Sequence, residues 1–146
     1  MSEASSREPL GPSIRHDVEK IVNQLLDVGV RIEMARVYAF ERNADKAQEA
    51  IGRARKIAGT DRTAWWIGDD GTILDARIDM LRGNDRRAVG RLAKPLLEAE
   101  TLDSAEGFAL LAVAAHRSGQ EEIAHHARVE AERRGVDMSA LDEPVK

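Results

Sequence analysis

Small residues recur three times along this chain with the same spacing, and this recurrence constrains the fold more than any other feature. In each set the second member lies twelve residues after the first, and the third lies seven residues later: Ala35/Ala47/Ala54, Ala76/Ala88/Pro95 and Ala112/Ala124/Ala131. The start of the unit moves by 41 and then by 36 residues, a period typical of helical hairpin repeats. Small residues at fixed points let helices approach closely. The spacing therefore predicts an all-α fold of stacked antiparallel hairpins, about three repeats plus an N-terminal helix.

Composition narrows the possible partners. The absence of cysteine excludes disulfides, thiolate metal sites and thiol catalysis. A net charge of -4 at pH 7 disfavours binding to a phosphate backbone. The first residues lack the apolar core of a secretory signal, and the longest apolar stretch is too short to span a bilayer. We expect a cytoplasmic protein that binds neither nucleic acid nor membrane.

The N-terminal region predicts a helix whose apolar side needs a cover. We expect residues 1–12 to form a flexible tail, residues 13–138 the domain and residues 139–146 a short polar tail. After Ser13, apolar residues follow one helical stripe, and Gly29 is expected to end or bend this helix. The stripe either covers the open end of the first hairpin, which we favour, or pairs between two chains. Its members are Ile14, Val18, Ile21, Val22, Leu25 and Leu26.

Local signals predict further boundaries. Residues 59–72 read as a long link, with a turn at Gly68–Gly71, and the second hairpin is expected to begin near Thr72. Pro95 predicts a kink in the return helix of that hairpin. Asp103 and Glu106 resemble a capping box at the start of the third hairpin.

The third hairpin resembles a tetratricopeptide repeat. The residues that carry the resemblance are a large residue, a Leu-small pair, a turn glycine and two alanines: Phe108, Leu111, Ala112, Gly119, Ala124 and Ala131. The first hairpin matches less completely, because Arg42 and Asn43 stand where the family usually has a glycine turn. In the second, Asp75, Asp79 and Pro95 replace apolar or small residues.

The resemblance implies a peptide-binding concave face formed by the first helix of each hairpin. Three arginines on this face are candidates for binding an acidic partner: Arg36, Arg77 and Arg117. They could form bidentate hydrogen bonds with its carboxylates, or they could be solvated or paired with Glu33 and Asp75. One of the adjacent indoles Trp65 and Trp66 is expected to close a hairpin junction and the other to be available to a partner, unless both are structural. The candidate partner-binding residues are Ile32, Arg36, Phe40, Ile73, Arg77, Met80, His116, Arg117 and Trp66.

Motifs that would carry chemistry are weak. His116, His125 and His126 suggest a metal site. However, Glu121 and Glu122 lie one helical turn before His125 and His126, and glutamate–histidine pairs at this spacing are common on helix surfaces. A phosphate loop and a nucleophile–base arrangement are both missing from the sequence. We therefore expect no enzyme, cofactor or metal, and a small adaptor that binds a peptide or protein segment. The alternatives are a ligand- or metal-sensing module and a dimer similar to the three-repeat chaperones of secretion systems, joined through its N-terminal helix.

Overall fold

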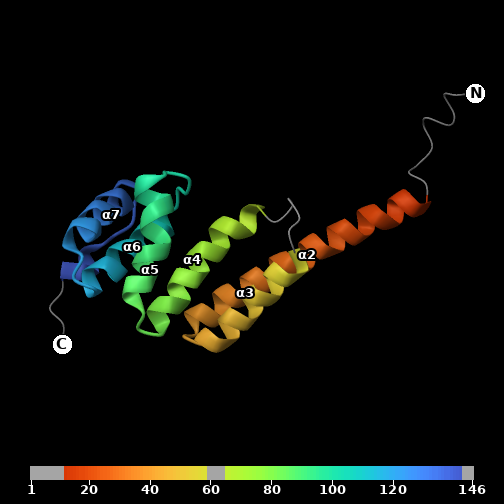
Figure 1. Ribbon diagram of the computed structural model, residues 1–146, viewed down its shortest axis with the longest axis horizontal. Coiled ribbons are helices and arrows are strands. Elements are labelled where there is room, and N and C mark those ends of the chain that lie inside the picture. The colour runs from red at the N-terminus through yellow and green to blue at the C-terminus, as the bar shows by residue number, and fades with distance from the viewer. Residues whose placement is uncertain (1–11, 59–64, 143–146) are drawn as a thin grey trace, which may run out of the picture.

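The computed structural model describes residues 12–58 and 65–142, which form three helical hairpins that follow one another along the molecule (Figure 1). Consecutive helices pair as α2/α3, α4/α5 and α6/α7. The described ranges contain no strand, so the predicted all-α class is confirmed. The helices are α2 (Pro12–Phe40), α3 (Ala44–Ala58), α4 (Trp65–Leu81), α5 (Asp85–Ala93), α6 (Ala105–Arg117) and α7 (Glu121–Arg133).

All three hairpins use the same turn. The residue that starts each reversal has a positive φ: 61° at Arg42, 77° at Gly83 and 76° at Gly119. The next backbone N–H then donates to a carbonyl five residues earlier, which satisfies an otherwise free helix-end acceptor. These bonds run from Asn43 to Tyr38 (2.8 Å), from Asn84 to Asp79 (2.7 Å) and from Gln120 to Ala115 (2.8 Å).

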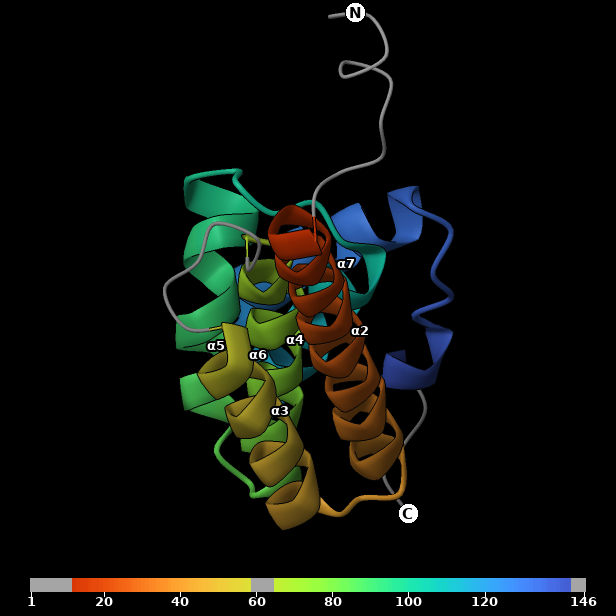
Figure 2. The same cartoon turned by 90° about the vertical axis from the view of Figure 1, so that its right-hand side faces the viewer.

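The hydrophobic core has two parts, and α4 contributes to both. Leu74 and Ile78 of α4 pack with α2 and α3, whereas Ile73 and Ala76 pack with α5, α6 and α7. Figure 2, seen from the α2 end, places α2 and α3 in front of α4. Every alanine of the recurring sets is buried, at 7% exposure for Ala124 and 0% for the others. Alanine is required at these points because the helices that meet there leave no room for a larger side chain.

The helix α2 runs without interruption through Gly29, so the predicted break is wrong. A glycine inside a helix costs about 1 kcal/mol, which is small beside the burial of aliphatic side chains on both sides of it. Val28 and Ile32, one turn apart, are 3% and 2% exposed in the first core. Because α3 has only 15 residues against 29 in α2, the N-terminal half of α2 extends beyond its partner.

The predicted link before the second hairpin is partly helical. The helix α4 begins at Trp65 rather than near Thr72, so the four residues Gly68–Gly71 lie inside it and do not form a turn. Gly and Asp residues favour turns, but in Gly-Asp-Asp-Gly the packing of the helix that continues after them stabilises a helical backbone instead.

Two ends of helices differ from simple α geometry. After α5 the chain forms one π-helical turn, Lys94–Glu98, closed by the Ala99 N–H donating to the Lys94 carbonyl at 2.8 Å. Pro95, where the sequence predicted a kink, lacks the N–H that would continue the α-helix, and the structure has the π-helical turn at this place. The cap of α6 is Ser104, whose hydroxyl accepts from the Gly107 N–H at 2.9 Å, and not Asp103 as predicted.

The packed region extends past residue 138. Met138 is buried, and Leu141, in the short 3₁₀ helix Ser139–Asp142, packs against the second core. The folded part therefore includes residues that the sequence assigned to a polar tail.

Candidate interaction surfaces

Two of the three predicted binding arginines, Arg36 and Arg77, lie where the first helices of the three hairpins meet. Arg77 of α4 donates from Nη2 to Glu106 Oε1 of α6 at 2.7 Å. Arg36 of α2 places Nη1 at 3.8 Å from Glu106 Oε2, with Asp70 Oδ2 at 3.9 Å and Glu33 Oε1 at 3.6 Å from its other nitrogens. Three carboxylates of the chain thus lie around the Arg36 guanidinium, and Glu106 also binds that of Arg77. These arginines link the hairpins, and their positive charge is neutralised within the molecule.

The apolar residues predicted beside them divide between core and surface. Ile32 and Ile73 are 2% and 6% exposed, so these two predicted contact residues belong to the core, although Ile32 also lines a hollow beside α2. Met80 is half-buried against the second core. Phe40 is 67% exposed, and the Arg77 guanidinium carbon lies 5.0 Å from the centre of its ring.

His116 and Arg117 are exposed in the last turn of α6. His116 Nδ1 lies 3.5 Å from Glu121 Oε1, and Arg117 Nη1 lies 4.0 Å from Asp85 Oδ1. The part of the chain that the structure describes holds no group of three or more potential metal ligands. Trp66 belongs to the first turn of α4, and its side chain lies outside the described residues, as does that of Trp65.

Asp75 and Asp79 form a ladder of ion pairs with arginines on both sides of α4. Arg55 of α3 binds Asp75 through two nitrogens, at 2.6 and 3.2 Å, and Arg91 of α5 binds Asp79 at 2.5 Å. Gly71 makes room for this crossing, since a Cβ there would lie 2.7 Å from Arg55 Nη2. Asp75 and Asp79, the two carboxylates that depart from the repeat pattern, therefore join α4 to α3 and α5. Comparison with the repeat pattern did not predict this role.

Charge pairing also closes the C-terminal end of the molecule. Arg134 donates to Asp103 and Glu130, both at 2.7 Å, and its guanidinium carbon lies 4.3 Å from the centre of the Phe108 ring. The Arg134 hydrogen bond lowers the pKa of Glu130, against a smaller raising effect of desolvation. The last hairpin is thus covered by its own side chains.

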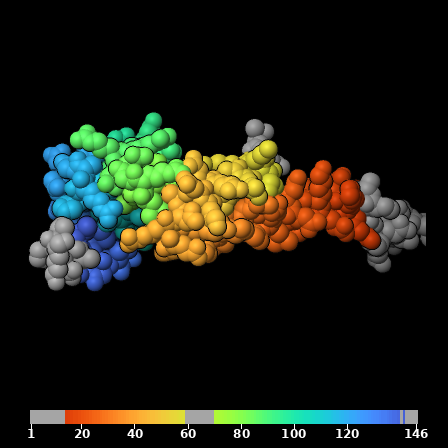
Figure 3. All heavy atoms as spheres, turned by 90° about the horizontal axis from the view of Figure 1, so that it is seen from below, coloured from red at the N-terminus to blue at the C-terminus, as the bar shows by residue number. Residues whose placement is uncertain are grey.

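The opposite end is different, because α2 leaves a large apolar surface uncovered. Nine of the ten exposed large apolar side chains in the described residues lie on α2, with exposed fractions from 40% at Met34 to 67% at Phe40. Every described side chain from Ile14 to Gln24 is exposed, and we call these residues the arm. The arm projects from the body in the space-filling view (Figure 3). It does not cap the first hairpin, so the favoured expectation for this helix is wrong.

The exposed residues continue from the arm onto the body as one stripe. Its members follow each other at four-residue spacing and then three: Val18, Val22, Leu26, Val30, Met34 and Val37. We call this stripe the α2 face. Four- and three-residue spacing places side chains on neighbouring turns of the same side of a helix. Assigning a helix break at Gly29 concealed this stripe, although the sequence contains it.

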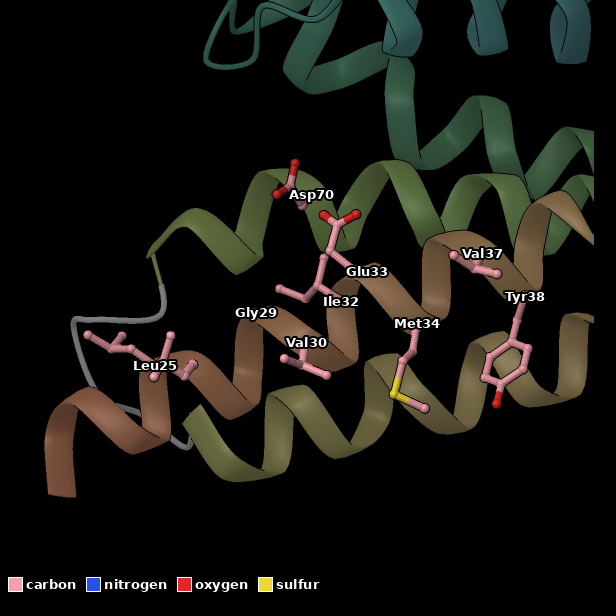
Figure 4. Close-up of a pocket in the computed structure, with 10 residues that line it drawn as sticks. Leu25, Gly29, Val30, Ile32, Glu33, Met34, Val37, Tyr38 and Asp70 are labelled. Carbon is pink, nitrogen blue, oxygen red and sulfur yellow. The ribbon is translucent and has the colours of Figure 1, made fainter. Parts of the chain in front are cut away.

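A hollow of about 690 Å³ lies along the α2 face. Figure 4 shows Val30, Met34 and Tyr38 on successive turns of α2, with Asp70 on the neighbouring helix α4. Leu25, Leu26, Gly29 and Val37 are also in its lining, whereas its charged groups are Glu33 and Asp70. The hollow is therefore apolar along its length with carboxylates at its α4 side.

The geometry defines a class: an all-α protein of three helical hairpins with one uncovered apolar helix face. No family model, curated protein or solved structure matches this chain. Among the described residues, none of the helices combines the length and the apolar character that crossing a bilayer requires.

Proposed function

We propose that this protein is a small protein-interaction scaffold that binds a helical segment of a protein along the α2 face. The observation that carries the proposal is the concentration of exposed apolar side chains on α2, nine of ten in the described residues. Contiguous apolar patches of this kind mark interaction sites, whereas isolated ones are ordinary.

A helix suits this surface better than an extended strand. The α2 face and its hollow are elongated along α2, and the described residues flanking them are in helices. Backbone groups of α2 are already paired within the helix, so they offer no edge for strand addition. An amphipathic helix instead places one side chain on each turn against such a stripe.

The resemblance to tetratricopeptide repeats supports the scaffold class, and the site proposed here differs from the usual concave face. Arg36 and Arg77 face Glu106, Asp70 and Glu33, which argues against an acidic partner on the concave side. The exposed arm favours the dimeric alternative within the same class, which resembles secretion-system chaperones in size and N-terminal helix.

Site-specific photo-crosslinking in the producing cells tests this function. A benzoylphenylalanine replaces Val30 on the α2 face, and a control variant carries it at Val129, an exposed valine of α7. We expect adducts from position 30 whose linked peptide, identified by mass spectrometry, is an amphipathic helix. Adducts of equal yield at both positions, or none at position 30, would contradict the proposal.

A further inference from the structure

The arm has the properties of a helix that is covered in the functional state. In proteins most helical stability comes from packing an apolar face against a neighbour. The arm lacks such packing among the described residues, because all its described side chains are exposed, and it contains the β-branched residues Ile14, Val18, Ile21 and Val22, which lower helix propensity. The helix α3 ends before it reaches the arm, so none of the described helices covers the arm, and we look for its cover in another molecule.

The pattern along the α2 face is symmetric about Gln24. Val22 and Leu26 lie two residues on either side of Gln24, and Val18 and Val30 lie six residues on either side. Further out, Arg15 and Glu33 lie nine residues away, at opposite ends. Eighteen residues make about five helical turns, so Arg15 and Glu33 project in the same direction.

We infer that the helix bound by the α2 face is α2 of a second copy of this chain, lying antiparallel with a two-fold axis at the level of Gln24. This inference rests on the function proposed above and names its partner. A two-fold interface requires a surface complementary to itself, in which each contact occurs twice. The symmetric pattern meets that requirement: Val22 lies against the partner subunit's Leu26, and Val18 lies near the partner subunit's Val30.

Charge fixes the direction of the pair. In the antiparallel arrangement Arg15 meets the partner subunit's Glu33, a pair that occurs at both ends. A parallel arrangement would place Arg15 beside the partner subunit's Arg15 and Glu33 beside the partner subunit's Glu33. The Glu33 side chain is 69% exposed, so its carboxylate can meet the partner subunit's Arg15 while lying 3.6 Å from Arg36 of its own chain. Glu19 lies opposite the partner subunit's Gly29, where the missing side chain leaves the carboxylate access to water.

The extent of contact suits a dimer. From Ile14 to Met34 the two helices overlap over about 30 Å, or roughly six turns. Each arm then lies along the hollow of the other body, so the apolar side chains of arm and body cover one another. The arm's charges, Arg15 and Lys20 against Asp17 and Glu19, sum to zero with His16 neutral, so no net charge on the arm opposes its docking on the other body.

Sedimentation velocity of the full chain, from micromolar to near-millimolar concentration, tests the inference. The wild type is expected to be a dimer. Arg15→Glu and Glu33→Arg each replace two attractive contacts by two repulsive ones and are expected to weaken the dimer about tenfold or more. The double variant restores both contacts with reversed sign and should regain wild-type affinity. Lys20→Glu makes the same charge change as Arg15→Glu on another side of α2 and should leave the dimer unchanged.

A monomeric wild type, or a dimer that Arg15→Glu and Glu33→Arg leave intact, would overturn the inference. Failure of the double variant to recover would overturn the antiparallel arrangement. Circular dichroism verifies that all variants remain helical, which is expected because the substituted side chains are exposed. A monomer whose position 30 still crosslinks to a helix of another protein would refute the second copy while leaving the scaffold function standing. A monomer without such crosslinks would refute both.

Discussion

At the first hairpin turn, Arg42 holds the left-handed conformation that glycine holds at the other two turns. Its φ is 61°, against 77° at Gly83, where a Cβ would meet no atom within 4 Å. A left-handed backbone conformation costs an L-residue about 1–2 kcal/mol. Replacing that residue by glycine removes the cost, but it also raises the conformational entropy of the unfolded chain, which offsets part of the gain in stability. We expect Arg42→Gly to raise the free energy of unfolding by up to about 1 kcal/mol and Gly83→Ala to lower it by about 1 kcal/mol. Urea unfolding measures both. A fall for Arg42→Gly, or a rise for Gly83→Ala, would show that the two turns are not equivalent.

The recurring alanines give a second residue-scale prediction. Ala47 is fully buried between α2 and α3, whereas His126 is exposed on α7. Ala47→Leu overfills a close helix contact and should cost about 1–3 kcal/mol, and His126→Leu should cost little. Thermal and urea unfolding of the two variants compare these costs. Similar small effects would mean that the alanine spacing does not mark helix contacts.

Single residues were predicted best where the requirement is steric. The alanine sets were identifiable because a fixed spacing of small residues has few explanations other than close packing. Ile32 and Ile73 were assigned to an exposed face because the family frame places them there, whereas helix α4 in fact lies over one and the second core encloses the other. Which aliphatic residue of a helix is buried depends on how the neighbouring hairpin packs against it. The local sequence does not specify that packing.

At the scale of elements, the ion pairs of α4 should contribute more to stability than those on the surface. Asp79 is 5% exposed and binds Arg91, while Asp45 has a 94% exposed side chain and binds Arg82. Asp79→Ala leaves Arg91 without its buried partner and should lower the free energy of unfolding by about 2–4 kcal/mol. Asp45→Ala should lower it by less than about 1 kcal/mol. Denaturant unfolding of both variants measures the difference, and equal costs would rule out a structural role for the α4 ladder.

Helix boundaries were harder to predict than helix existence. The sequence placed breaks at Gly29 and at Gly68–Gly71, where local chemistry favours turns, but α2 and α4 continue through both. A glycine inside a helix destabilises it by about 1 kcal/mol, which is less than the stabilisation from burying a few aliphatic side chains. The break assigned at Gly29 also hid the α2 face, because a stripe divided between two helices has no continuous side.

At the scale of the whole molecule, self-association should make thermal stability depend on protein concentration. A dimer that forms only from folded chains is stabilised by mass action, so the melting temperature rises with concentration. Val22→Asp places a carboxylate at the centre of the α2 face and should remove this dependence. Differential scanning calorimetry over a wide concentration range measures it. A wild-type melting temperature that is independent of concentration would argue against the dimer.

Disulfide trapping tests the antiparallel pairing of α2 most directly. The chain has no cysteine, so Val22→Cys and Leu26→Cys each introduce a single thiol. The two variants are mixed in equal amounts and oxidised under mild conditions, and the disulfide-linked dimers are quantified by mass spectrometry. Random pairing of equal amounts already gives twice as much mixed dimer as either symmetric dimer. We therefore expect the mixed dimer, with position 22 joined to position 26 of the other chain, to form in clearly more than this twofold excess. The random 1:2:1 distribution of the three species, or no crosslinked dimer, would contradict the antiparallel pairing.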